Sequence, residues 1–147
     1  EAPRNTITAL LAEEKAAGLD RIDYFADFAR RVNALRDAVN AKLAELKAQG
    51  ASIAAYGAAA KGATFVNYFG IGADTVDFVV DRNVHKQGKY MPGGAIKVLD
   101  PSALLEHKPD YVLILAWNFA TEILQQQSEY RAAGGKFIIP IPTLEIV

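Results

Sequence analysis

The chain has 147 residues, of which 51% are hydrophobic and 22% charged, so it is long enough to bury a core and too apolar for a disordered protein. Its 16 basic and 17 acidic residues leave a net charge of −1, which gives no global field to favour nucleic acid or an anionic membrane as a partner. The sequence contains no cysteine, which excludes disulfides and cysteine zinc sites and suits the reducing cytoplasm, the localisation that we predict.

Other classes of protein are disfavoured by what the sequence lacks. No apolar run approaches the ~20 residues that span a bilayer, so we expect no membrane protein. His85 and His107 are the only histidines and show no metal-ligand spacing, so no metal site is predicted. The first residue is Glu1 and the only methionine is Met91, which indicates a piece of a larger protein.

Residues 1–50 are predicted to form a helical segment. A short helix over residues 5–17 is followed by Gly18, a typical helix stop, and a longer helix covers residues 22–49. One side of this long helix carries a stripe of apolar residues. The stripe would pack either across a sheet face or against a neighbouring domain or second subunit, so an oligomer is one expectation. The apolar residues of this stripe, at steps of three and four, are Phe25, Phe28, Val32, Leu35, Val39, Leu43 and Leu46.

From residue 52 onward, short apolar runs alternate with helical segments. Continuous Val, Leu and Ile runs are typical of strands covered on both faces, and their alternation with helices indicates a parallel sheet. We therefore predict that residues 51–147 form an α/β domain with a Rossmann-like, doubly wound, mostly parallel five-stranded sheet of order 3-2-1-4-5. The predicted strands are residues 52–56, 76–80, 95–98, 111–116 and 136–139, and the predicted helices are residues 60–69, 101–107 and 118–133.

A turn of small residues joins the first predicted strand to the following helix, as the dinucleotide fingerprint G-x-G-x-x-G requires. Gly57 permits a tight turn, Ala59 stands in place of the second glycine, and Gly62 permits close packing of helix on strand. Free N–H groups at the helix start and the charge of Lys61 suit phosphate or carboxylate oxygens, although a plain turn would use the same small residues for packing. The predicted binding residues here are Tyr56, Gly57, Ala58, Ala59, Lys61 and Gly62.

Two further groups of residues follow the ends of other predicted strands, where ligands of open parallel sheets bind. Asp81 stands where an acidic residue would accept hydrogen bonds from a ribose; alternatively it caps its loop or pairs with Arg82 or Lys86. Trp117 would stack on a base or sugar or else fill the core, and Asn118 would contact ligand or cap the next helix. The further predicted binding residues are Asp81, Arg82, Asn83, Lys86, Gln87, Trp117 and Asn118.

No catalytic residue is predicted in this chain. The sequence shows no nucleophile elbow, no H-E-x-x-H motif and no acid pair at a recognisable spacing, and His85 has no obvious orienting partner. The residues therefore favour a domain that binds a ligand over one that performs the chemistry.

Several separate motifs give the chain a resemblance to a known family. Through essentially its whole length the chain resembles the C-terminal domain of S-adenosylmethionine-dependent C-methyltransferases that act on nucleotide-linked sugars. On this resemblance a sugar nucleotide replaces NAD as the expected ligand of the glycine turn. The motifs are residues 56–62, Asp81-Arg82-Asn83 with residues 85–88, Pro92-Gly93, Trp117-Asn118, and Gly135-Lys136-Phe137 leading to Pro140-Ile141-Pro142.

The resemblance implies the last part of a three-part enzyme (EC 2.1.1.-), in which a zinc-binding domain and a methyl-donor domain precede this one. S-adenosylmethionine and the catalytic base would belong to the upstream part, and the fragment alone would be inactive. A base would remove a proton beside the ketone of a nucleotide-linked keto-sugar, and the enolate would attack the donor's methyl group. The residues that would line a cleft toward the preceding domain are Lys61, Arg82, Asn83, Lys86 and Asn118.

Two alternatives come from other classes of protein. A freestanding dinucleotide-binding or sensor module would bind NAD or a similar cofactor by itself. A purely structural docking domain would use the long helix of residues 22–49 as its interface and bind no small molecule.

Overall fold

The computed structural model describes residues 4–147 and divides them into two units, the first ending at Asp37 and the second spanning Ala38–Val147. The first unit contains helix α1, Arg4–Ala16, and the beginning of helix α2, Ile22–Ala48. Gly18 follows α1 with a φ of +79°, a left-handed conformation that ends helices. Both predicted N-terminal helices are therefore confirmed to within one residue at each end.

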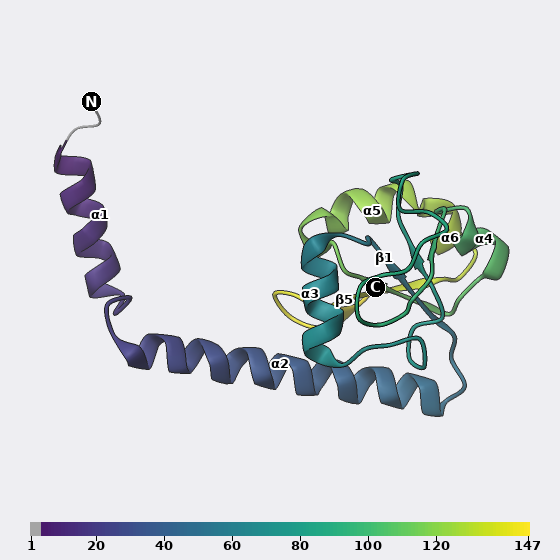
Figure 1. The fold of residues 1–147 in the computed structure, drawn as a ribbon, viewed down its shortest axis with the longest axis horizontal. Helices are drawn as coiled ribbons and strands as arrows, with labels where there is room; N and C mark the ends of the chain where they lie inside the picture. The colour runs from purple at the N-terminus through teal and green to yellow at the C-terminus, as the bar shows by residue number, and fades with distance from the viewer. Residues whose placement is uncertain (1–3) are drawn as a thin grey trace. The chain divides into compact units, whose positions relative to one another are not determined.

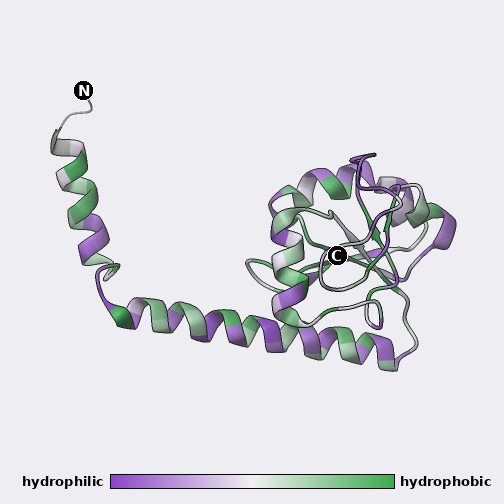
Figure 2. Cartoon of the chain, viewed as in Figure 1, coloured by the Kyte–Doolittle hydropathy of each residue, from purple (hydrophilic) through white to green (hydrophobic). Residues whose placement is uncertain are grey.

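The helices of the first unit leave large apolar side chains in solvent. Hydrophobic residues recur along both helices between hydrophilic ones (Figure 2), yet they are not buried within this unit. On α2 the same apolar stripe continues into the second unit, where Val39, Leu43 and Leu46 are at most 4% exposed. The large apolar side chains that are at least half exposed in the first unit are Ile7, Leu10, Leu11, Ile22, Phe25 and Phe28.

The second unit is built on one six-stranded sheet of order β3-β2-β1-β4-β5-β6, with helices on both sides (Figure 1). The first four neighbouring pairs in this order are parallel, and β6 pairs with β5 in the antiparallel direction. The predicted α/β fold and the order 3-2-1-4-5 are confirmed. The strands are β1 Ile53–Tyr56, β2 Val79–Val80, β3 Val98–Leu99, β4 Tyr111–Ile114, β5 Lys136–Ile139 and β6 Glu145–Ile146.

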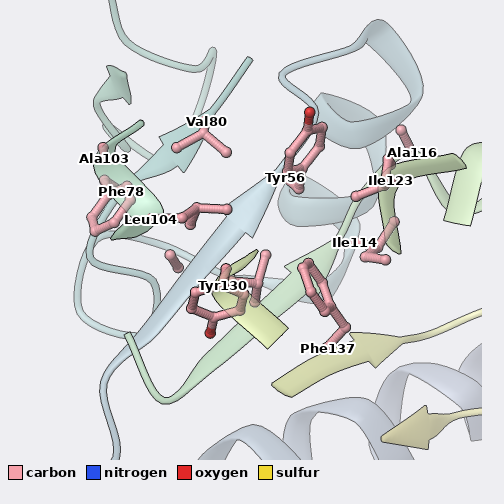
Figure 3. Close-up of a cluster of buried hydrophobic side chains, with 12 residues drawn as sticks. Tyr56, Phe78, Val80, Ala103, Leu104, Ile114, Ala116, Ile123, Tyr130 and Phe137 are labelled. Atoms are coloured by element: carbon pink, nitrogen blue, oxygen red, sulfur yellow. The ribbon is translucent and has the colours of Figure 1, made fainter. Parts of the chain in front are cut away.

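Alternating residues of the strands are buried on opposite faces of the sheet. One face packs against the later helices around the ring of Phe137, which is fully buried (Figure 3). On the other face α3 contributes Phe65, Val66 and Phe69 to the core, and Asn40 of α2 donates a hydrogen bond to the carbonyl of Phe69 at 2.9 Å. The helices of this unit after α2 are α3 Ala60–Phe69, α4 Ala103–His107, the 3-10 turn η1 Trp117–Phe119, α5 Ala120–Gln126 and α6 Ser128–Ala132.

The structure corrects four details of the predicted fold. The second strand begins at Val79 and not at residue 76. The third strand begins at Val98 and not at Ala95, because Ala95 has a φ of +52°, which no strand residue adopts. The helix predicted over residues 118–133 is divided, since the backbone at Gln127 (φ −101°, ψ 29°) departs from helical values. The sixth strand was not predicted, because two residues are too short a run to show a period.

Among the helices of residues 4–147, none combines the length and the hydropathy that a membrane-spanning helix requires.

Candidate functional site

The candidate site lies at the carboxyl ends of β1, β2 and β4, the central strands of the sheet. The chain leaves β1 toward β2 on one side, and β4 lies on the other side, so β1 is where the strand order reverses. In open α/β sheets this reversal leaves a crevice in which ligands bind. The turn after β1 is therefore the natural starting point.

The glycine turn after β1 is held close to both neighbouring strands. The N–H of Gly57 donates to the carbonyl of Val80 at 2.8 Å, and Gly57 has a φ of +98°. A Cβ atom at Gly57 would lie 2.9 Å from the Cβ of Ala116, at the end of β4. Both the backbone conformation and the close approach therefore require glycine here.

Gly62 brings helix α3 against the sheet. A Cβ atom at this position would lie 2.9 Å from the carbonyl oxygen of Gly57 and 3.0 Å from the Cβ of Leu115. The two glycines thus have the roles expected from the fingerprint: Gly57 makes the turn, and Gly62 lets the helix pack against it.

The start of α3 carries backbone donors and one cation. Ala59, the N-cap residue, makes no side-chain hydrogen bond to the helix, so its first N–H groups are not capped by that residue. Lys61, in the first turn, places its Nζ 4.8 Å from the centre of the Trp117 ring and 5.6 Å from that of Phe119. The dipole of α3 and this ammonium group together favour an anion at the turn.

Asp81 and Lys86 form a half-buried ion pair that closes onto the glycine turn. Lys86 Nζ lies 3.1 Å from Asp81 Oδ2 and donates to the carbonyl of Ala58 at 2.8 Å. The other carboxylate oxygen of Asp81 accepts the N–H of Asn83 at 2.8 Å. Both alternatives for Asp81, capping its loop and pairing with Lys86, therefore occur together, and both of its oxygens already have partners.

The rest of the loop after β2 is held by Gln87. Its Nε2 donates to the carbonyl of Asp81 at 3.0 Å and to Asp100 Oδ2 at 2.9 Å. The side-chain oxygen of Asn83 accepts the N–H of His85 at 3.0 Å, so Asn83 shapes the loop as well. Arg82 extends the other way, with its guanidinium 3.7 Å from Glu122 on α5 and both side chains exposed.

Pockets flank the glycine turn on both sides. One, of about 190 Å³, lies toward the β2–β3 loop and includes Lys86, Lys89 and Tyr90. The other, of about 240 Å³, lies between the ends of β1, β2 and β4 and includes Tyr56, Arg82 and several residues of α5. The turn thus lies between these two cavities. Each is smaller than the ~300 Å³ at which sites that enclose a drug-sized ligand begin.

The structure brings most of the predicted site residues together at this edge. Trp117 is half-buried and packs on α3, with its ring 5.9 Å from that of Phe65, while its neighbour Asn118 is exposed. Asn118 is not a helix cap, because it lies inside the 3-10 turn and the N-cap of α5 is Phe119. Within residues 4–147, no group of three or more His, Cys, Asp or Glu side chains is arranged to hold a metal ion.

The comparison with known families decides the relationship of the chain. A family model described as the C-methyltransferase C-terminal domain matches residues 1–142. The chain belongs to this family. Over 144 residues, 98% of its length, this C-methyltransferase C-terminal domain is 35% identical to C-methyltransferase NovU of Streptomyces niveus. It spans about a third, 34%, of the length of that relative.

The residues that α5 and the turn before it contribute to the 240 Å³ pocket of this C-methyltransferase C-terminal domain were not predicted from the sequence. Phe119, Glu122 and Gln126 line the 240 Å³ pocket beside Tyr56. They follow β4 at steps of three and four, a spacing that puts them on one face of a helix. The signal was present in the sequence, but polar residues at that spacing also occur on any solvated helix.

Proposed function

We propose that the chain is the sugar-nucleotide-binding part of an S-adenosylmethionine-dependent C-methyltransferase that acts on a nucleotide-linked keto-sugar. The observation that carries the proposal is the glycine turn, where the start of α3 has no side-chain cap and the half-buried Lys61 holds its ammonium group over the Trp117 and Phe119 rings that follow β4. Two phosphate groups suit such a turn, because its backbone N–H groups and its cation offer donors and positive charge together.

The state of Asp81 supports a diphosphate ligand over an adenosyl cofactor at this turn. A dinucleotide site uses a free carboxylate after the second strand to accept the hydroxyl groups of a ribose. Here each oxygen of Asp81 already accepts one hydrogen bond, from Asn83 and from Lys86, so this carboxylate is less available to a ribose. We therefore assign S-adenosylmethionine, which supplies the methyl group, to the part of the enzyme upstream of this chain.

The chemistry assigned to the whole enzyme is the transfer of a methyl group to carbon. A base removes the proton beside the sugar ketone, the resulting enolate carbon forms a bond to the methyl carbon, and the bond from that carbon to sulfur breaks. This chain would hold the nucleotide so that the sugar reaches the upstream part. Correct placement of two reactants can supply several kcal/mol of the barrier reduction, on the order of 7–11 in favourable cases.

Titration calorimetry of the full-length enzyme tests the placement. We expect Lys61→Ala to weaken the binding of nucleoside diphosphates roughly tenfold or more, since a hydrogen bond to a charged group contributes about 1.5–3 kcal/mol. Arg82→Ala should have a smaller effect, because its guanidinium is exposed and already near Glu122. The matched control is Lys136→Ala, which removes the same charge from the opposite end of the sheet. Unchanged affinity in both Lys61→Ala and Arg82→Ala would show that the placement is wrong.

We also propose that the apolar side chains of the first unit contact the upstream part of the same protein. Phe25 and Phe28 are 54% and 56% exposed, yet they lie on the same stripe of α2 whose later members are buried. The relative is about three times as long as this chain, which leaves ample sequence for such a contact. Burial of the surface that these two phenylalanines still expose would contribute about 2–3 kcal/mol.

Substitution of these side chains in the full-length enzyme tests the contact. Phe25→Ser with Phe28→Ser should lower the melting temperature, whereas Arg31→Ser with Ala34→Ser, on the same helix, should change it little. Sedimentation distinguishes the partners: if the phenylalanine variant is a monomer where the parent is a dimer, a second copy covers the stripe. In that case, or if melting is unchanged, the proposed upstream contact is wrong.

A further inference from the structure

The two buried tyrosines of the core cluster differ in how their hydroxyl groups are satisfied. Tyr130, 2% exposed, donates its hydroxyl to the carbonyl of Pro109 at 2.6 Å. Tyr56, 5% exposed, has a buried hydroxyl that makes no hydrogen bond of normal geometry among residues 4–147, although the Gln127 side chain lies near it. A buried hydroxyl without a partner is unfavourable, so its presence at the end of β1 calls for an explanation.

The Tyr56 hydroxyl points toward the candidate site and not into the core. Figure 3 shows it beyond the end of β1, on the opposite side from the hydroxyl of Tyr130. Burial raises the pKa of Tyr56, while the nearby side chain of Gln127 lowers it. The charges that act on this pKa are Arg82, Asp81 and Glu122. All three also line the 240 Å³ pocket, as Tyr56 does. Tyr56 and Arg82 also line an adjoining pocket of about 460 Å³ that includes Gln127, so the hydroxyl lies where the two pockets meet.

The lining of the pocket suits a planar ring with a polar edge. Its walls include Gly57, Ala59, Ala116 and Ile123, which offer small or apolar surfaces, and the 52% exposed Phe119 offers an aromatic face. The polar side chains of the lining are Tyr56, Asp81, Arg82, Glu122 and Gln126. A sugar with hydroxyl groups all around would need more donors and acceptors than these.

The charges of the pocket argue against a phosphate group inside it. Asp81 and Glu122 bring two carboxylates to the lining, against the single guanidinium of Arg82. A diphosphate is better placed at the neighbouring start of α3, where Lys61 supplies a cation. Since Gly57 and Ala59 belong to both the turn and the pocket, a group attached to that diphosphate would enter the pocket directly.

We propose that this pocket binds the nucleobase of the sugar nucleotide, with the Tyr56 hydroxyl as a hydrogen-bond partner of the base edge and Phe119 against the base face. The inference rests on the proposed function and adds to it the subsite that binds the base of the nucleotide. The ligand would satisfy the one buried side-chain polar atom left unpaired among residues 4–147, so the hydroxyl of Tyr56 would serve binding, whereas its ring packs in the core.

Tyr56→Phe separates a binding role from a structural one. Because the hydroxyl has no protein partner, its removal should leave the melting temperature of the full-length enzyme unchanged or raise it slightly. The same change should weaken the binding of nucleoside diphosphates about fivefold to tenfold, through the loss of one hydrogen bond. Tyr130→Phe is the matched control, for which the pattern is reversed: a lower melting temperature and unchanged affinity. Phe119→Ala should weaken binding about tenfold through lost stacking.

The titration uses the full-length enzyme with the diphosphates of thymidine, uridine, guanosine and adenosine. If the parent enzyme binds none of the four, the proposed function itself fails. If Lys61→Ala weakens binding but Tyr56→Phe and Phe119→Ala do not, the diphosphate site stands and the nucleobase pocket is wrong. A fall in melting temperature for Tyr56→Phe as large as that for Tyr130→Phe would also overturn the inference, because it would show a structural role for the hydroxyl.

Discussion

At the amino-terminal end of the sheet, polar groups bond one another, whereas at the carboxyl-terminal end a buried hydroxyl has no partner among residues 4–147. Before β1, the N–H and the hydroxyl of Ser52 both donate to Asp110, at 2.8 and 2.7 Å. The N–H of Asp110 donates back to the Ser52 hydroxyl at 3.0 Å. Tyr130 is likewise satisfied, by Pro109. We call this the closed end because its polar groups bond one another, although pockets of about 340 and 110 Å³ lie here too.

The other end of the same strands is arranged differently. The Tyr56 hydroxyl makes no hydrogen bond of normal geometry, and the N-cap residue of α3 has no side-chain bond to the helix. This difference predicts which residues serve stability and which would bind the proposed ligand. Substitutions at the amino-terminal end should alter unfolding alone, and those at the carboxyl-terminal end should alter binding.

The largest effect is expected from Gly135→Ala, at the amino-terminal end. A methyl group there would overlap the ring of Tyr130, which cannot move away because it is buried and bonded to Pro109. We expect a loss of about 3 kcal/mol in the free energy of unfolding, measured with urea. Gly134→Ala is the control: its φ of +97° is unfavourable for alanine, but the space is open, so about 1 kcal/mol should be lost. Equal losses of unfolding free energy in the two variants would mean that the Tyr130 ring moves to accommodate the new methyl group.

A smaller loss of stability with a loss of binding is expected from Gly62→Ala, at the carboxyl-terminal end. The new Cβ would meet a backbone carbonyl and Leu115, so α3 must shift away from the turn, at a cost of about 1–3 kcal/mol. Nucleoside diphosphate affinity of the full-length enzyme should fall with it. Gly70→Ala, at the far end of α3, has open space and a φ of +68°, so it should lose stability and keep its affinity. If both variants keep their affinity, the position of α3 does not determine binding.

Much of the fold could be predicted from the sequence because the signals were strong and local. The apolar runs that became β1, β4 and β5 and the glycine stop after α1 each depend on a few neighbouring residues. The strand β6 and the break at Gln127 could not be predicted, since the first depends on pairing with β5 and the second has no proline or glycine to mark it.

The candidate site was predictable in position but not in its bonding. Parallel strands bring their carboxyl ends to one edge, so residues after β1, β2 and β4 had to lie near one another. Nothing in the sequence chose between Lys86 and Arg82 as the partner of Asp81, because that choice depends on the path of the loop. Whether the hydroxyl of Tyr56 has a partner also depends on packing alone. Tyr130 is a buried tyrosine too, yet its hydroxyl is bonded to Pro109.

The smallest effect concerns the pH dependence of the closed end. Hydrogen bonds from the backbone N–H and then the side chain of Ser52 hold the pKa of Asp110 below its usual range. A carboxyl group whose pKa is lowered by folding stabilises the protein above its unfolded pKa, near 3.9, and this contribution is lost as the pH falls through the folded pKa. The gap in unfolding free energy between the parent and Asp110→Asn should therefore be constant from about pH 7 to 5 and shrink toward pH 3.

Ser52→Ala provides the control for this last effect, because it removes the hydroxyl that donates to Asp110 while the carboxylate stays in place. In the Ser52→Ala background the Asp110→Asn change should leave a smaller gap at neutral pH and a weaker pH dependence. Urea unfolding at several pH values measures both gaps. A gap that stays the same size down to pH 3, or that is identical in the two backgrounds, would mean that the closed end owes its stability to packing and not to the bonds between Ser52 and Asp110. The contrast between the two ends of the sheet would then rest on Tyr56 and Tyr130 alone.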